Sequence, residues 1–240
     1  MYSKLKWPSR SKLRTRNCSP VNLMKKCQHE KYTVGYQPCS MADLNRAVTV
    51  LNNGGVVAFP TETYYGLAVD PLNPMALNYL FTLKQRDISK PILTLVDDSE
   101  SLSSLVQEIP EVYSQLMEKF WPGPLTLIFQ AKLNLPTLLT AGTSTIGVRQ
   151  SSHPFARQLL RAFGRPITAT SANISGHDAA VDAYEVKAQF GTQIDMVFDG
   201  GRAPGISGST IVSLDGTQVK LIREGIIPFG EIMSSIEKKT

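Results

Sequence analysis

Segments with helical and strand periodicity alternate along the chain from residue 40 onward, and this alternation constrains the fold more than any other feature. The helical patterns cover residues 41–52, 74–84, 110–120 and 154–163, and the strand patterns cover residues 56–59, 92–96, 125–129, 145–148 and 167–170. Two further strands, 210–214 and 218–223, flank Asp215-Gly216, which is typical of a hairpin turn. We therefore expect an α/β fold with a mixed sheet and helices on its faces.

Local signals support the boundaries of these helices. Gly54-Gly55 and Gly164 are helix stops. Asn73-Pro74 combines a capping residue with a proline suited to the first helical position. The helix that begins there presents Leu77, Leu80 and Phe81 to the interior, and we expect it to deliver Lys84 and Arg86 beyond this apolar face, so that alanine at either position leaves folding nearly intact.

The positive charge of the chain is concentrated at its start. Residues 1–30 contain eight of the 25 Lys and Arg residues but one of the 20 acidic residues, so the remainder carries 17 basic and 19 acidic residues. A nucleic-acid footprint over the whole surface therefore does not follow from the net charge of +5. We expect residues 1–30 to be a disordered extension, acting as a transit peptide, as an RNA-binding arm or in no specific role, and residues 31–240 to be one catalytic domain.

Several classes of protein do not fit this sequence. No apolar run is long enough to cross a membrane, so we expect a soluble protein. Cys18, Cys27 and Cys39 match no zinc or redox spacing, and their odd number argues against a disulfide framework. The three histidines have no partners at metal-ligand spacing, so we expect no protein-built transition-metal site.

Two short segments carry the strongest functional signal. Residues 84–91 concentrate three cations, Lys84, Arg86 and Lys90, and residues 171–176 are a run of small and hydroxyl-bearing residues around Asn173. Cations neutralise phosphate oxygens, and small residues let backbone amides approach them closely. A charge cluster or a Ser/Asn/Gly run alone is common on surfaces and in turns. Together they predict a polyphosphate site.

The motifs around these segments resemble those of the YrdC-like threonylcarbamoyl-AMP synthase family. Residues 60–67, PTETYYGL, resemble its PTETVYGL loop, and Lys84, Arg86, Ser171 and Asn173 match its KxR…SxN signature. The segments WPGPLT (121–126), GVR (147–149) before HP (153–154), GSTIV (208–212) and LIREG (221–225) match four further motifs in order. The resemblance covers residues 40–236.

This resemblance implies a twisted, largely open sheet around a large, positively lined cavity. Family members join L-threonine, bicarbonate and ATP into threonylcarbamoyl-AMP and pyrophosphate, and partner proteins pass the group to tRNA, beside the anticodon. Such in-line nucleotidyl transfer depends on positioning and charge neutralisation and needs no protein nucleophile. Consistent with this, the sequence shows no Ser-His-Asp or Cys-His constellation. Mg²⁺ is expected to arrive on ATP, with no metal ligand from the protein.

The resemblance also implies roles for individual residues. Lys84, Arg86, Ser171 and Asn173 are the implied catalytic set. The residues implied for ATP are Lys84, Arg86, Lys90, Thr145, Ser171, Asn173 and Arg223, and those for L-threonine are Thr61, Thr63, Arg149 and Ser209. Purely structural roles stay open, because hydroxyls on strands often satisfy backbone groups and arginines often form salt bridges.

Two departures from the family pattern concern the segment after Arg86. Lys90 replaces an Asn, which adds a cation, and Leu95 replaces a His that approaches the threonine, which puts one substrate contact in question. The extra C-terminal domain of longer relatives is not expected here.

Two alternative functions remain at this point. One is a carbamoyl-AMP-forming module like that of hydrogenase maturation proteins. The other is a module for RNA binding or ribosome maturation that binds tRNA or double-stranded RNA through the same cavity. We expect a cytoplasmic protein, or a mitochondrial one if the basic start is a transit peptide.

Overall fold

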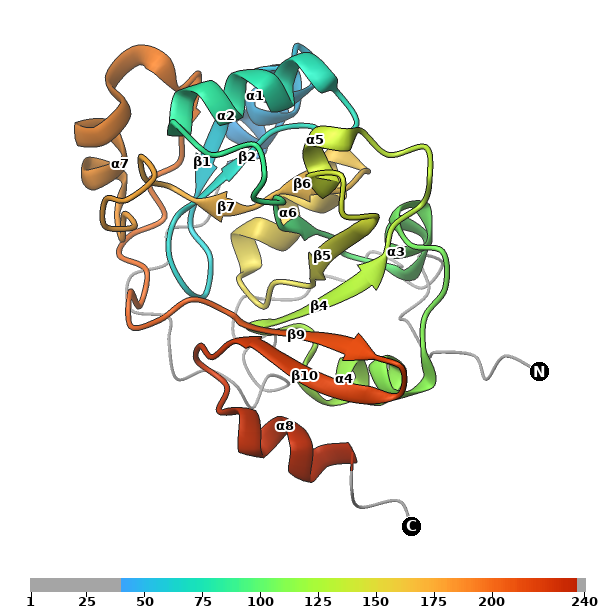
Figure 1. Ribbon diagram of the computed structural model, residues 1–240. Coiled ribbons are helices and arrows are strands. Elements are labelled where there is room, and N and C mark those ends of the chain that lie inside the picture. The colour runs from blue at the N-terminus through green and yellow to red at the C-terminus, as the bar shows by residue number, and fades with distance from the viewer. Residues whose placement is uncertain (1–39, 237–240) are drawn as a thin grey trace, which may run out of the picture.

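The computed structural model describes residues 40–236, which form an α/β fold with two open sheets (Figure 1). The helices are α1 (Met41–Asn52), α2 (Pro74–Lys84), α3 (Ser99–Leu105), α4 (Glu111–Phe120), α5 (Thr137–Thr140), α6 (Pro154–Phe163), α7 (Ala183–Phe190) and α8 (Phe229–Ile236), with a short 3₁₀ turn, η3 (Gly191–Gln193). The strands are β1 (Val57–Phe59), β2 (Gly66–Ala68), β3 (Thr94–Leu95), β4 (Leu125–Gln130), β5 (Thr145–Arg149), β6 (Ile167–Thr168), β7 (Thr170–Ser171), β8 (Met196–Val197), β9 (Thr210–Asp215) and β10 (Gln218–Arg223).

The strands divide between a smaller and a larger sheet. The four-stranded sheet has the order β7-β2-β1-β8 and the six-stranded sheet has the order β10-β9-β4-β5-β3-β6. Both are mixed: β1 pairs parallel with β8 and antiparallel with β2, and β4 pairs parallel with β9 and antiparallel with β5. The β9–β10 hairpin forms one edge of the larger sheet, far from α1 and α2 (Figure 1).

Side-chain caps define where several helices begin. The Ser40 side chain accepts a hydrogen bond from the amide of Asp43 at the start of α1. The Asn73 side chain accepts hydrogen bonds from the amides of Met75 and Ala76 at the start of α2. His153 caps α6 through its ring nitrogen, and Gly164 ends that helix in the left-handed region. These contacts satisfy backbone groups that have no partner within the helix.

Two hydrophobic clusters make up the core. The larger joins both sheets to α2, α3, α4, α7 and α8, and the smaller lies between α1, α6 and the other face of β1. Strand β1 contributes to both, because Ala58 packs in the larger cluster while Val57 and Phe59 pack in the smaller. Burial on both faces explains why residues 56–59 are apolar without alternation.

The expected α/β class with mixed, open strand pairing is confirmed, and so are the four helices and the hairpin, but the strands form two sheets where one was expected. The prediction of one continuous strand at 167–170 is wrong: β6 belongs to the six-stranded sheet and β7 to the four-stranded sheet. The Thr168 hydroxyl explains why the chain changes sheet between β6 and β7. It donates to Leu67 O (3.0 Å) and accepts from Val69 N (2.9 Å), so it replaces backbone groups beside β2. The strand expected at 92–96 is limited to β3.

The tail assigned to residues 1–30 lies outside the described residues. Within residues 40–236, no helix is long and apolar enough to cross a bilayer.

Candidate active site

A cavity of about 440 Å³ opens where the two sheets meet. Its lining comes from the loop between β1 and β2, the segment after α2, strands β4, β5, β7 and β9, and the end of β10. Arg86, Arg149 and Arg223 line it, and no Asp or Glu is among the described residues at its surface. Such an excess of guanidinium groups in a partly desolvated space favours an anionic ligand.

Strand β5 contributes a row of cavity residues. Thr145, Gly147 and Arg149 line the cavity, whereas Ile146 and Val148 between them are buried in the core. This is the alternation of a strand with one face toward a core. Because Gly147 has no side chain, Thr126 and Leu93 approach the strand closely there: a Cβ would lie 3.4 Å from Thr126 Cγ2 and 3.8 Å from Leu93 Cδ1.

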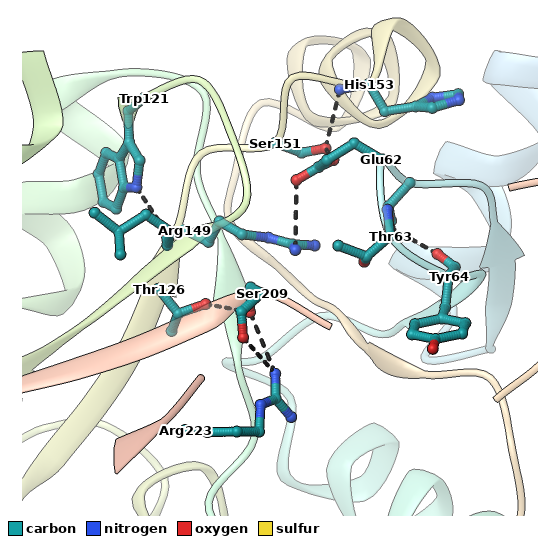
Figure 2. Close-up of polar contacts among 12 residues, drawn as sticks. Glu62, Thr63, Tyr64, Trp121, Thr126, Arg149, Ser151, His153, Ser209 and Arg223 are labelled. Carbon is teal, nitrogen blue, oxygen red and sulfur yellow. Dashed lines mark hydrogen bonds and ion pairs between the residues drawn. The ribbon is translucent and has the colours of Figure 1, made fainter. Parts of the chain in front are cut away.

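Arg149 is buried and pairs with one carboxylate among residues 40–236. Its Nη1 lies 3.4 Å from Oε1 of Glu62, and Glu62 accepts a hydrogen bond from the Ser151 hydroxyl. Figure 2 shows the guanidinium between Glu62 and Thr63. Arg149 Nε is buried and has no hydrogen-bond partner among the described residues.

Arg223 approaches the cavity from the end of β10. Its Nη2 donates to Ser209 O (2.8 Å), and the Ser209 hydroxyl shares a 2.8 Å hydrogen bond with Thr126 (Figure 2). Burial, followed by the charge of Arg149, lowers the pKa of Arg223. Two guanidinium groups close enough to oppose each other's charge create a positive potential that an anion would relieve.

The loop between β1 and β2 supplies two linked hydroxyls. Thr61 Oγ1 donates to Tyr64 O (2.7 Å) and lies 2.9 Å from Thr63 Oγ1. Since a hydroxyl has one hydrogen, Thr63 is the donor in the second bond, and its lone pairs are left to accept from a ligand.

Arg86 follows a change of direction at the end of α2. Gln85 caps the helix in the left-handed conformation (φ 49°), which separates Arg86 from the helix. Arg86 donates to Lys90 O (3.2 Å) and Pro91 O (2.9 Å) and lines the cavity, where burial lowers its pKa. Those contacts fix the guanidinium at the cavity wall.

Lys84 has a different environment from the one the sequence suggested. Its side chain is buried, is not among the lining residues, and donates to Ser171 O, Asn173 O (2.7 Å) and Asn173 Oδ1 (3.4 Å). The prediction that it lies beyond the apolar face of α2 is therefore wrong, while the expected effect of alanine on folding stays a prediction. Position 84 continues the buried row of Leu77, Leu80 and Phe81 at helical spacing.

Of the eleven residues proposed from the sequence, eight line this cavity: Thr61, Thr63, Arg86, Thr145, Arg149, Ser171, Ser209 and Arg223. Lys84 lies behind the loop that carries Ser171, Asn173 is part of that loop, and Lys90 is exposed nearby. Leu95, the residue in place of a family histidine, is buried in the smaller core cluster and does not line the cavity. Its neighbours Ile92 and Leu93 line it instead.

The Sua5/YciO/YrdC family model, described as "Telomere recombination", matches residues 49–225, a range that contains all ten strands of the described residues. The chain belongs to this family. Among its family relatives, the threonylcarbamoyl-AMP synthase of Pyrococcus abyssi is 37% identical over 186 residues, covering 78% of this chain and 55% of the relative. That of Vibrio cholerae is 36% identical over 185 residues, covering 76% and 97%.

Solved structures of the family agree with the fold. P. abyssi Sua5 in complex with L-threonine superposes with a TM-score of 0.81 at 35% identity, covering 84% of this chain and 59% of that chain. E. coli YciO gives a TM-score of 0.73 at 27% identity, covering 80% and 94%. The chain thus spans little more than half of the Pyrococcus protein and nearly all of YciO.

Several residues of the site were not proposed from the sequence, and four of them bear on its chemistry. Tyr64, Thr126 and Gly147 line the cavity, and Glu62 pairs with Arg149. Strand alternation could have identified two of them, because Gly147 shares a face of β5 with Arg149, and Thr126 alternates with buried Leu125 and Leu127 in β4.

Proposed function

We propose that this protein is a threonylcarbamoyl-AMP synthase, which converts L-threonine, bicarbonate and ATP into threonylcarbamoyl-AMP and pyrophosphate. The observation that carries the proposal is a cavity lined by three arginines and a set of hydroxyls, in a chain of the same family as synthases from Pyrococcus and Vibrio. One cavity with separate guanidinium groups suits substrates that bring both a carboxylate and phosphates.

L-threonine is held near Arg149. The guanidinium binds its carboxylate through the edge that faces Thr63. The free lone pairs of Thr63 accept from the ammonium or hydroxyl, with Thr61 orienting Thr63 and Ser209 completing the polar wall. Apolar lining from Leu93 and other side chains excludes water and contacts the methyl group.

ATP occupies the rest of the cavity. Arg86 and Arg223 neutralise phosphate oxygens, with Lys90 adding an exposed cation at the rim, and Ser171 and Thr145 contribute hydroxyls. Lys84 and Asn173 contribute to ATP binding indirectly, because they hold the loop that carries Ser171. Mg²⁺ enters bound to the triphosphate, because the lining contains phosphate-binding groups but no carboxylate for the metal among the described residues.

The reaction proceeds in two steps. The threonine ammonium loses a proton to solvent, the amine nitrogen bonds to the bicarbonate carbon, and a carbon–oxygen bond of bicarbonate breaks with loss of water, giving a carbamate. A carbamate oxygen then bonds to the α-phosphorus of ATP, the bond to the bridging oxygen breaks, and pyrophosphate leaves. The chain's residues align the reactants, exclude water from the unstable carbamate and stabilise phosphate charge, which are the main sources of rate in phosphoryl-type transfer. Partner proteins then transfer the threonylcarbamoyl group to tRNA.

Pyrophosphate release, with each small substrate omitted in turn, tests this function. We expect little ATP turnover without threonine or bicarbonate. Serine should be about 10–200-fold less efficient, since it lacks one methyl group. Equal ATP cleavage with and without an amino acid contradicts the proposal.

A further inference from the structure

Lys84 and Arg86 lie two residues apart but face different surroundings. Lys84 is the last residue of α2 and is 1% exposed, whereas Arg86 follows the left-handed Gln85 and lines the cavity. The helix end thus separates two cations that the sequence presents as one cluster.

The ammonium of Lys84 has no donor left for a ligand. A lysine ammonium has three N–H donors. They meet three oxygens, the backbone carbonyls of Ser171 and Asn173 and the side-chain carbonyl of Asn173, the last at a longer 3.4 Å. A phosphate could bind Lys84 only by breaking one of these contacts in the interior.

The backbone of Lys84 also forms a hydrogen bond with this loop. Lys84 O accepts the amide of Ser175 (2.8 Å), and Asn173 Nδ2 donates to Ile174 O and His177 O (3.0 and 2.7 Å). The Ser171 hydroxyl donates to Asn173 Oδ1 (2.6 Å). Lys84 and Asn173 therefore fix the turn of residues 171–177 from behind, while Ser171 faces the cavity.

We propose that Lys84 is a positioning residue, which holds the 171–177 turn so that Ser171 is aligned at the cavity, and that it does not bind phosphate itself. Its effect on catalysis rests on the proposed synthase activity, but its effect on the turn does not. Within the KxR…SxN pattern, Arg86 and Ser171 are then the groups that meet the substrate.

A charged group suits this position despite its burial. Burial, followed by the charge of Arg86, lowers the pKa of Lys84 to about 7. Three oxygen acceptors favour the protonated form, because a neutral amine has one N–H fewer and a lone pair that would face an oxygen. An apolar side chain of similar length would leave the Asn173 carbonyl without this donor.

Hydrogen exchange of the 171–177 peptide tests the positioning role without any assay of activity. In Lys84→Met, we expect exchange to be roughly tenfold faster or more, the loss expected for buried hydrogen bonds to a charged group. Arg86→Met should leave exchange of this peptide unchanged, and so should Lys132→Met, an exposed control outside the cavity. Unchanged exchange in Lys84→Met would overturn the proposal.

Kinetics separate positioning from binding. Lys84→Met should lower kcat with little change in KM for ATP, whereas Arg86→Met should raise KM for ATP. If Lys84→Met instead raises KM for ATP as Arg86→Met does, while the turn exchanges normally, then Lys84 is a phosphate ligand. If no variant or parent forms adenylate, the proposed function fails, and the exchange result still decides the role of Lys84.

Chemical labelling of the unmodified protein covers the case in which Lys84→Met does not fold. Amine acetylation mapped by mass spectrometry should modify the exposed Lys90 and Lys132 readily and Lys84 slowly, with ATP making no difference at Lys84. Rapid labelling of Lys84 that ATP suppresses would contradict a buried positioning role.

Discussion

Arg149 and Glu62 form an ion pair beside the cavity in which both partners keep unused hydrogen-bonding capacity. Arg149 Nη1 lies 3.4 Å from Glu62 Oε1, yet neither Oε1 nor Arg149 Nε makes a hydrogen bond among the described residues. Glu62 Oε2 accepts from the Ser151 hydroxyl, which also accepts the amide of His153 at the start of α6. The pair thus compensates charge and leaves Arg149 able to bind a carboxylate.

Glu62→Gln should therefore destabilise the free protein more than the threonine complex. Removing the carboxylate leaves the buried Arg149 charge uncompensated, at a cost of about 3 kcal/mol. A bound threonine carboxylate restores a counter-charge. Thermal unfolding with and without L-threonine should show a lower Tm for the variant and a larger upward shift on adding threonine than in the parent.

The control for this measurement is Glu118→Gln, which removes an exposed acid from α4. It should change neither Tm nor the threonine shift appreciably. If Glu62→Gln is as stable as the parent, Glu62 does not compensate Arg149, and the account of this ion pair is wrong.

Gly208→Ala should weaken ATP use through Arg223. A Cβ at Gly208 would lie 2.8 Å from Arg223 Nη2 and 3.2 Å from its Cζ, so the guanidinium must move away from Ser209. A flexible side chain can move without unfolding the protein. We expect KM for ATP to rise about tenfold, equivalent to roughly 1.4 kcal/mol of lost interaction.

Steady-state kinetics at varied ATP concentration check this effect. Gly230→Ala is the matched control, because a Cβ there meets no atom within 4 Å. Unchanged kinetics in Gly208→Ala would mean that the position of Arg223 is unimportant for ATP.

The fold could be predicted where local signals and tertiary packing agree. The capping Asn73 and the left-handed Gly164 define their helices in the sequence and in the structure. Strands of two or three residues, such as β2 and β8, have too few side chains to show a period and exist because a neighbouring strand pairs with them. The crossing at Thr168 depends on a side-chain hydroxyl replacing backbone groups, which no periodicity reveals.

The cavity residues were predictable as a set, but their separate environments were not. Motifs far apart in sequence supplied Arg149, Ser209 and Arg223, which the structure brings together. Lys84 was misjudged because its charge suggested exposure, although its spacing from Leu77 and Leu80 placed it on the buried face of α2. The charge of Lys84 suggests exposure and its helical position suggests burial, and the structure follows the helical position.

Acid should destabilise the protein through His153. Its Nδ1 accepts the amide of Phe155 as the cap of α6, and burial lowers its pKa to about 4 from 6.5. Between these values the unfolded chain binds the proton more readily, so the free energy of unfolding falls as pH decreases from about 6.5 to 4, by on the order of 3 kcal/mol.

Denaturant unfolding at several pH values measures this loss. His153→Asn keeps a capping acceptor but cannot titrate, so its stability should depend less on pH over the same range. Equal losses in parent and variant would exclude His153 as the source.

A chain that begins at Glu30 should retain full synthase activity. Residues 1–30 hold eight Lys and Arg residues but none of the site residues, and they precede the family match at residue 49. Pyrophosphate release by both chains at two salt concentrations checks this, and affinity for tRNA is what the shorter chain should lose. A large loss of activity at both salt concentrations would assign the segment a part in catalysis.

Product mass after reaction with ¹³C-bicarbonate tests the central claim most directly. The protein, incubated with MgATP, L-threonine and labelled bicarbonate, should form threonylcarbamoyl-AMP whose mass carries the heavy carbon, together with an equal amount of pyrophosphate. Arg149→Met should form little of it, because the threonine carboxylate loses its partner. AMP or ADP release without a labelled threonine adduct would contradict the assignment of this cavity to threonylcarbamoyl-AMP synthesis.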